Sequence, residues 1–218
     1  MQKVGFIFDL DGVIVDTAKY HYLAWKNLAK ELGFEFTKEQ NELFKGVSRK
    51  RSLELLLSIG KVSATQEQFD TWMVEKNVDY LAYIEKMDTS EILPDVPKVL
   101  DFLKANNIPI SLGSASKNAQ LILEKVNLLS YFNVIVDGNS VTKAKPDPEV
   151  FLIGAKKLGL PPENCIVFED AVAGVKAANA AGMVSIGIGD KKVLHEADYI
   201  FSNFTEISLA FLKKIAKV

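Results

Sequence analysis

The most constraining feature of the sequence is a short apolar run near its start that leads into an Asp-x-Asp-Gly motif. Residues 4–8 read Val-Gly-Phe-Ile-Phe, a pattern typical of a strand buried on both faces of a parallel sheet. Asp9 and Asp11 follow, and residues two apart on an extended chain point to the same side. Since open α/β sheets bind ligands at the carboxyl ends of their strands, we expect both carboxylates to lie in a ligand site.

Two neighbouring carboxylates are costly unless a cation or a shared proton offsets their repulsion. Such a pair suits Mg²⁺-assisted chemistry at phosphorus, in which one carboxylate attacks and the other transfers protons with the leaving oxygen. Turn aspartates after a strand are the alternative interpretation. We favour the catalytic one because charged and hydroxyl residues follow at the ends of other predicted strands.

Composition places the chain among soluble globular proteins. Its 218 residues fit one core with a modest insertion, and 48% of them are hydrophobic and 25% charged. The net charge of -2 offers no basic surface, so we expect no nucleic-acid partner. No apolar window approaches the ~20 residues of a spanning helix and no leader pattern precedes residue 4, so we expect a cytoplasmic monomer that does not bind membranes. Cys165 opens an apolar run and is expected to be a buried structural thiol.

The periodicity predicts two parts of different character. Residues 16–87 show helical patterns and no convincing strand, whereas strand and helix patterns alternate after residue 92. The predicted fold class is therefore α/β, with a Rossmann-like parallel-sheet core and an inserted α-helical cap domain. We assign residues 1–15 and 92–218 to the core and residues 16–91 to the cap with its hinges.

Three cap residues are candidates for the site, each with an ordinary alternative. His21 lies on the inward stripe of the first predicted helix, where a satisfied, partly buried histidine is equally expected. Arg49 follows a predicted N-cap, Ser48, so that it could hold a phosphate at a helix start or lie on the surface. Lys76 interrupts an apolar stripe, where it could extend to solvent or point across a cleft toward a substrate.

Four predicted strand ends in the core carry polar side chains. After Asp9 and Asp11 come Ser114 at the second strand end, Lys145 in a Lys-Pro loop, and the pair Glu169-Asp170. Serine hydroxyls at such a place could bind phosphate or act as ordinary helix caps. An ordered set of this kind is hard to obtain by chance.

These motifs resemble those of the haloacid dehalogenase superfamily: Asp-x-Asp-Gly-Val at 9–13, the serine-rich strand end at 114, Lys-Pro at 145, and Glu-Asp before Ala-x-x-Gly at 169. The resemblance covers essentially the whole chain. It implies that Asp9 is a nucleophile that forms an aspartyl phosphate and that Asp11 is the general acid and base. It implies that Ser114 and Lys145 bind the transferring phosphoryl group. The Mg²⁺ site that it implies consists of Asp9, Asp11, Glu169 and Asp170.

The cap motifs at residues 16–25, 45–52 and 76–77, together with the core segment 114–118, are similar to those of the β-phosphoglucomutase family. This similarity implies isomerisation of β-D-glucose 1-phosphate and glucose 6-phosphate, with β-glucose 1,6-bisphosphate as intermediate and activator. It adds His21 to the catalytic residues as a hinge contact near Asp11. The implied substrate-binding residues are Thr17, Trp25, Gly46, Val47, Ser48, Arg49, Ser52, Lys76, Ala115, Ser116, Lys117 and Asn118. The sequence departs from the pattern of this family at Lys143, an extra lysine shortly before Lys145.

Two other functions fit the same residues. An Mg²⁺-dependent sugar-phosphate phosphatase of the same superfamily would discharge the phospho-aspartate to water. A non-catalytic sugar-phosphate-binding protein would use the basic residues without turnover, although the complete acidic and basic set argues against it. In each case the expected partner is a small-molecule sugar phosphate.

Overall fold

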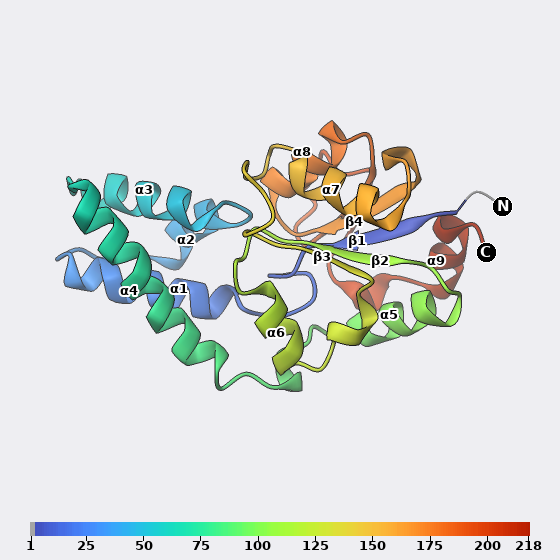
Figure 1. The fold of residues 1–218 in the computed structure, drawn as a ribbon, viewed down its shortest axis with the longest axis horizontal. Coiled ribbons are helices and arrows are strands. Elements are labelled where there is room, and N and C mark those ends of the chain that lie inside the picture. The colour runs from blue at the N-terminus through green and yellow to red at the C-terminus, as the bar shows by residue number, and fades with distance from the viewer. Residues whose placement is uncertain (1–2) are drawn as a thin grey trace.

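A six-stranded parallel sheet forms the centre of the larger part of the molecule in the computed structural model, which describes residues 3–218 (Figure 1). The strands are β1 (Gly5–Phe8), β2 (Ile110–Gly113), β3 (Val134–Val136), β4 (Cys165–Glu169), β5 (Val184–Ile188) and β6 (Tyr199–Phe201). They lie in the order β3-β2-β1-β4-β5-β6, and every neighbouring pair is parallel. The chain order therefore reverses beside β1, which is where such sheets bind ligands.

The register of the central strands aligns their carboxyl ends. Phe8 of β1 pairs with Leu112 of β2 and with Phe168 of β4. The residues that follow these three positions therefore come to one edge of the sheet. All four residues of β1 are buried, as expected for a strand covered on both faces.

Helices cover both faces of the sheet (Figure 1). On one face lie α5 (Val96–Ala105), α6 (Ala119–Lys125) and α9 (Leu209–Ala216), and on the other lie α7 (Glu149–Leu158) and α8 (Val172–Ala180). The alternation of side chains along β1 supplies both interfaces, because Phe6 and Phe8 pack into the first cluster and Ile7 into the second. Phe8 also stacks on Phe168 with ring centroids 4.8 Å apart.

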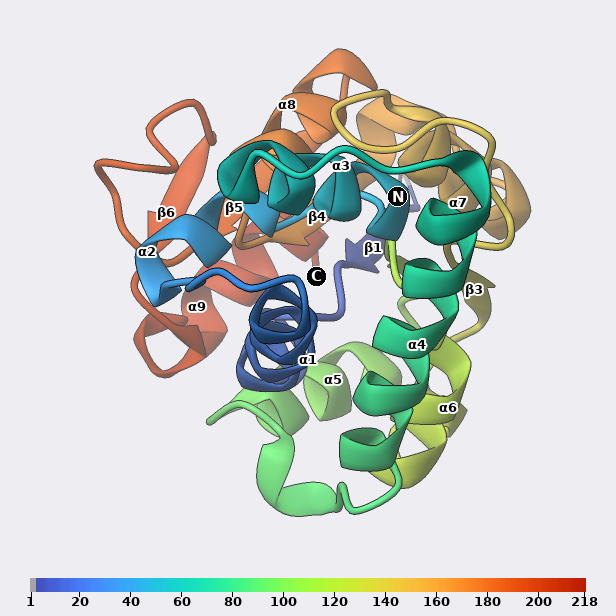
Figure 2. The same ribbon diagram turned by 90° about the vertical axis from the view of Figure 1, so that its left-hand side faces the viewer.

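Four helices stand beyond the carboxyl edge of the sheet: α1 (Ala18–Glu31), α2 (Lys38–Asn41), α3 (Arg49–Gly60) and α4 (Gln66–Ile84) (Figures 1 and 2). They share an apolar cluster of their own, built around Trp25, Leu53 and Leu56. The predicted α/β class with a helical insertion is thus confirmed. The domain boundaries at 15/16 and 91/92 stay a prediction, and the first two residues of the segment 1–15 lie outside the described residues.

Local signals fix most of the helix starts in this insertion. Thr37 and Thr65 each form a capping box with the glutamine three residues later, and the Ser48 hydroxyl accepts a hydrogen bond from the Arg51 amide. Thr17 precedes α1 but caps no amide, because its hydroxyl donates to Asp11. None of the helices in residues 3–218 is long and apolar enough to cross a membrane.

Candidate active site

A cavity of about 340 Å³ lies between the carboxyl edge of the sheet and the helical insertion. Both parts of the chain line it. From the core come Asp9, Asp11, Ser114, Lys145 and Asp170, and from the insertion come His21, Trp25, Arg49, Ser52 and Lys76. The structure therefore brings the two sets of predicted site residues to one place.

Lys145 is the electrostatic centre of the core side of the cavity. Its Nζ lies 2.6 Å from Asp9 Oδ1 and 2.8 Å from Glu169 Oε2, and all three side chains are buried. Burial opposes the positive charge, but the carboxylates of Asp9 and Glu169 outweigh it and raise the pKa of Lys145. The lysine is therefore a permanent ammonium that offsets the charge of the candidate nucleophile.

Asp9, Glu169 and Asp170 form a group that could hold a metal ion, since one carboxylate oxygen from each lies within 4.8 Å of the others. Burial raises the pKa of Glu169 to about 7, and burial together with Glu169 raises the pKa of Asp170 well above its ordinary value. One ammonium cannot balance three enclosed carboxylates. The donor set is all oxygen, which fits a hard divalent cation such as Mg²⁺.

Two glycines make room for these acids. A Cβ added at Gly12 would lie 2.2 Å from Asp170 Oδ2, and Gly12 also has a φ of +80° that other residues rarely adopt. A Cβ at Gly174 would lie 1.9 Å from the Glu169 carboxyl carbon. The Asp-x-Asp-Gly and Ala-x-x-Gly motifs thus have a steric reason for their glycines.

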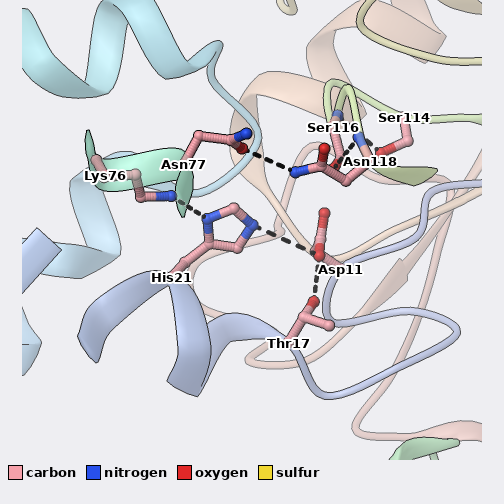
Figure 3. Close-up of polar contacts among 8 residues, drawn as sticks. All are labelled: Asp11, Thr17, His21, Lys76, Asn77, Ser114, Ser116 and Asn118. Atoms are coloured by element: carbon pink, nitrogen blue, oxygen red, sulfur yellow. Dashed lines mark hydrogen bonds and ion pairs between the residues drawn. The ribbon is translucent and has the colours of Figure 1, made fainter. Parts of the chain in front are cut away.

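The side chain of Asp11 turns to the helical insertion instead of joining the metal group. Thr17 donates a hydrogen bond to Asp11 Oδ1, and His21 Nε2 lies 3.8 Å from the same oxygen (Figure 3). Burial raises the pKa of Asp11 to about 6, and the nearby Asp9 adds to the shift. The group therefore exchanges a proton near neutral pH, as a general acid and base must. Its assignment as a metal ligand stays a prediction.

His21 connects Asp11 to Lys76. Lys76 Nζ lies 3.0 Å from His21 Nδ1, and burial, followed by the charges of Lys76 and Arg49, lowers the pKa of His21 well below its ordinary value. The imidazole is therefore neutral. Nδ1 faces the lysine and Nε2 faces Asp11, so the tautomer that suits an ammonium at Nδ1 carries its proton on Nε2.

The insertion presents cations that have no carboxylate partner. Lys76 is only 3% exposed, and its Nζ lies 4.6 Å from the centre of the Trp25 ring and 4.7 Å from that of Tyr80. Burial, followed by repulsion from Arg49, lowers its pKa to about 7. In the described part of the chain neither Lys76 nor Arg49 makes a salt bridge. This side of the cavity is suited to an anion.

The serine-rich segment after β2 forms a loop of successive turns before α6. The Ser114 hydroxyl accepts from the Ser116 amide at 3.1 Å, and the Ser116 hydroxyl accepts from the Asn118 amide at 3.2 Å (Figure 3). Hydroxyls that accept from an amide two residues later stabilise turns. The segment is therefore not helical, and α6 begins only at Ala119. Ser114 to Asn118 all line the cavity.

Nearly all the predicted site residues line this one cavity. Gly46, Val47 and Ser48 lie in its wall beside those already named, whereas Thr17 and Glu169 stand behind Asp11 and Lys145 and do not line it. Tyr80 also lines the cavity but was not predicted as a site residue, and its ring stacks on His21 with centroids 4.1 Å apart. Its spacing of four from Lys76 on one helix was the available signal. Asn41 and Lys45 were likewise not predicted as site residues, and they lie in the wall but have no distinctive spacing.

Comparison with known proteins agrees with this geometry. The family model of the haloacid dehalogenase-like hydrolases matches residues 4–182. The β-phosphoglucomutase of Bacillus subtilis (strain 168) is 40% identical over 208 residues, which are 94% of this chain and 92% of the relative. A phosphorylated carbohydrates phosphatase of Thermotoga maritima is 31% identical over 219 residues, which are 96% of this chain and 98% of the relative.

Among solved structures, the β-phosphoglucomutase of Clostridium difficile superposes with a TM-score of 0.94 at 38% identity, covering 99% of this chain and 98% of that one. The expected family, fold and enzyme class are confirmed by these similarities. The chain therefore belongs to the haloacid dehalogenase-like hydrolase family.

Proposed function

We propose that this enzyme isomerises β-D-glucose 1-phosphate and glucose 6-phosphate through β-glucose 1,6-bisphosphate. The observation that carries the proposal is the presence of two cationic places in one cavity, Lys145 beside Asp9 and the pair Arg49 and Lys76 across from it. A phosphomutase must bind the phosphate that it transfers and, at the same time, the one that it leaves in place. The similarity to two β-phosphoglucomutases supports this assignment.

Asp9 is the proposed nucleophile. Its carboxylate oxygen forms a bond to phosphorus as the bond from phosphorus to the sugar oxygen breaks, which leaves an aspartyl phosphate. Lys145 stands 2.6 Å from this carboxylate and offsets its repulsion of the incoming phosphate, and Ser114 lies at the neighbouring strand end. Bound to Asp9, Glu169 and Asp170, Mg²⁺ would add positive charge that stabilises the transferring phosphoryl group.

Asp11 is the proposed general acid and base. It protonates the sugar oxygen that leaves phosphorus and, in the reverse sense, takes the proton of the sugar hydroxyl that attacks. A pKa of about 6 keeps both forms populated near neutral pH. Thr17 donates a hydrogen bond to its carboxylate, and His21 Nε2 lies 3.8 Å from the same oxygen.

The distal phosphate is assigned to Arg49 with Ser116, Lys117 and Asn118. Lys76 is assigned to the sugar, with Trp25 beside it, and Gly46, Val47, Ser48, Ser52 and Ala115 complete the wall. A guanidinium, the Lys117 ammonium and the hydroxyl proton of Ser116 suit the oxygens of a phosphate. The bisphosphate intermediate would turn over between the two places, with β-glucose 1,6-bisphosphate in trace amounts acting as activator.

The proposed organisation follows from this chemistry. Residues 16–91 act as a cap whose closure on the core, residues 1–15 and 92–218, excludes water. We further propose a cytoplasmic monomer acting on a small sugar phosphate, with no nucleic-acid or membrane partner.

A sugar-phosphate phosphatase is the second candidate, because the relative from Thermotoga maritima is named as a phosphatase of phosphorylated carbohydrates. One assay separates the two. The enzyme is incubated with Mg²⁺, β-glucose 1-phosphate and a trace of β-glucose 1,6-bisphosphate, and glucose 6-phosphate and inorganic phosphate are measured together. A mutase forms glucose 6-phosphate in large excess, whereas release of inorganic phosphate as the main product would establish the phosphatase.

A further inference from the structure

An amide–amide hydrogen bond crosses from the helical insertion to the serine-rich loop of the core. Asn118 Nδ2 donates to Asn77 Oδ1 at 3.1 Å, joining the middle of α4 to the residue before α6 (Figure 3). We propose that Asn77 is a positioning residue that holds the cap on this loop and thereby sets how phospho-Asp9 partitions between a sugar and water. This inference rests on the proposed phosphomutase function.

The core partner of Asn77 belongs to a connected series of hydrogen bonds. Ser114 binds the Ser116 amide, Ser116 binds the Asn118 amide, and Asn118 binds Asn77. The series begins at the strand end beside Asp9 and finishes on α4, one residue from Lys76. The position of the cap over the distal-phosphate loop is thus tied to the same side chains that line the cavity.

Among residues 3–218, Asn77 makes the one side-chain hydrogen bond from α4 to residues 114–118. Further along α4, Tyr80 and Ile84 pack into the same apolar cluster as Ala119 and Ile122 of α6, so Asn77 supplies the polar part of this contact. The other polar side-chain contacts between the insertion and the core lie elsewhere. Thr17 donates to Asp11 and His21 Nε2 lies 3.8 Å from it, and at the far end of α4 Lys125 Nζ donates to the Glu85 carbonyl at 3.3 Å. Arg49 and Lys76 make no salt bridge to the core. Before an anion enters, the neutral contact of Asn77 therefore holds α4 over residues 114–118.

The position of the cap affects which nucleophile attacks phospho-Asp9, a sugar hydroxyl or water. In transfer, a sugar hydroxyl oxygen bonds to phosphorus, the bond from phosphorus to the Asp9 oxygen breaks, and the hydroxyl proton passes to Asp11. In hydrolysis a water molecule takes the place of the hydroxyl, and the products are free Asp9 and inorganic phosphate. A cap that lifts more often admits water, so loss of the Asn77 contact should favour hydrolysis.

The test uses full-length variants and measures two quantities. Asn77→Ala removes the acceptor, and Asn77→Asp keeps an acceptor oxygen. Asn27→Ala is the matched control, because Asn27 Nδ2 donates to Asp79 Oδ2 at 2.9 Å between α1 and α4, within the insertion and on its exposed surface. The readouts are the lifetime of the phosphoenzyme after a pulse of acetyl phosphate and the ratio of inorganic phosphate to glucose 6-phosphate formed from β-glucose 1-phosphate.

We expect Asn77→Ala to shorten the lifetime and raise the ratio by about fivefold, the size of the effect of one neutral hydrogen bond. Asn77→Asp should keep a lifetime close to that of the wild type, and Asn27→Ala should change neither quantity. Unchanged partitioning in Asn77→Ala, or an equal change in Asn27→Ala, would overturn the inference. If the wild type itself formed no glucose 6-phosphate, the proposed function would fail instead, so the two failures are distinguishable.

Discussion

The two sides of the cavity differ in how their charges are compensated. On the core side, Lys145 lies within 2.8 Å of two carboxylates, and a third completes a group fitted to a cation. On the cap side, Lys76 and Arg49 make no salt bridge among residues 3–218, and burial lowers the pKa of both. The core is built for chemistry at phosphorus, whereas the cap holds uncompensated positive charge that only an anionic substrate would neutralise.

The core side should fail completely when its nucleophile is removed. Asn at position 9 keeps the shape of Asp but can neither attack phosphorus nor carry the negative charge that Lys145 neutralises. We expect Asp9→Asn to abolish turnover while the protein stays folded. Steady-state assays with circular dichroism as a folding control check this, and substantial residual phosphotransfer would assign the covalent step to another group.

Removing the general acid and base of the core side should lower turnover strongly without abolishing it. In Asp11→Ala the nucleophile and the cation group are intact, while proton transfer to and from the sugar oxygen is lost. We expect turnover to fall by about 10²- to 10⁴-fold. The pH dependence of kcat/KM in the wild type should show a group with a pKa near 6 that is missing in the variant. Wild-type rates in Asp11→Ala would mean that another residue transfers the proton.

The cap side should respond only when the substrate carries a second phosphate. Arg49→Ala leaves Asp9, Lys145 and the cation group untouched, so its cost should lie in capturing the phosphate that is not transferred. We expect a loss on the order of 2 to 4 kcal/mol in kcat/KM for glucose phosphates. Acetyl phosphate has no second phosphate and should react with Asp9 at nearly the wild-type rate. Equal losses on both substrates would show that Arg49 does not bind the distal phosphate and would favour the phosphatase.

Lys76→Met should reduce catalysis least of these four variants, and it should make the folded protein more stable. Because burial depresses the folded-state pKa of Lys76 to about 7, the lysine destabilises the folded protein increasingly as the pH falls from about 10 to 7. Met preserves the apolar contacts with Trp25 and Tyr80 and removes this cost. We expect kcat/KM to fall about tenfold, since a hydrogen bond from a charged group is lost.

The stability of Lys76→Met is measured by urea unfolding. The free energy of unfolding should exceed that of the wild type by on the order of 4 kcal/mol at pH 7, and the difference should shrink toward pH 10. A variant that is less stable than the wild type at both pH values would show that the folded protein stabilises the positive charge of Lys76. The charge on the cap side would then not be uncompensated.

The core could be predicted from the sequence more fully than the cap. Asp9 and Ser114 directly follow buried strands and Glu169 ends a third, and parallel pairing necessarily brings such positions to one edge. Lys145 lies in the loop after β3, where the Lys-Pro motif was the signal. Helix starts marked by Thr37, Ser48 and Thr65 were also predictable, because capping signals are local.

The contacts between cap and core could not be predicted in the same way. The orientation of Asn77 toward Asn118 and the stacking of Tyr80 on His21 depend on how α1 and α4 pack over the sheet, and periodicity carries no information about that arrangement. Periodicity left three roles open for the same reason, those of His21, Arg49 and Lys76. The structure places them together around one cavity, which neither a buried histidine nor a surface arginine would require.

The most direct test follows the phosphoryl group itself. Enzyme labelled with ³²P on Asp9 is isolated and mixed with Mg²⁺ and unlabelled β-glucose 1-phosphate. The account predicts that Asp9 gives its label to the sugar 6-oxygen and then takes the unlabelled phosphate from the 1-oxygen, so that the label is recovered in glucose 6-phosphate. Recovery of the label as inorganic phosphate, or failure of Asp9 to carry it at all, would contradict a phosphomutase that works through this residue.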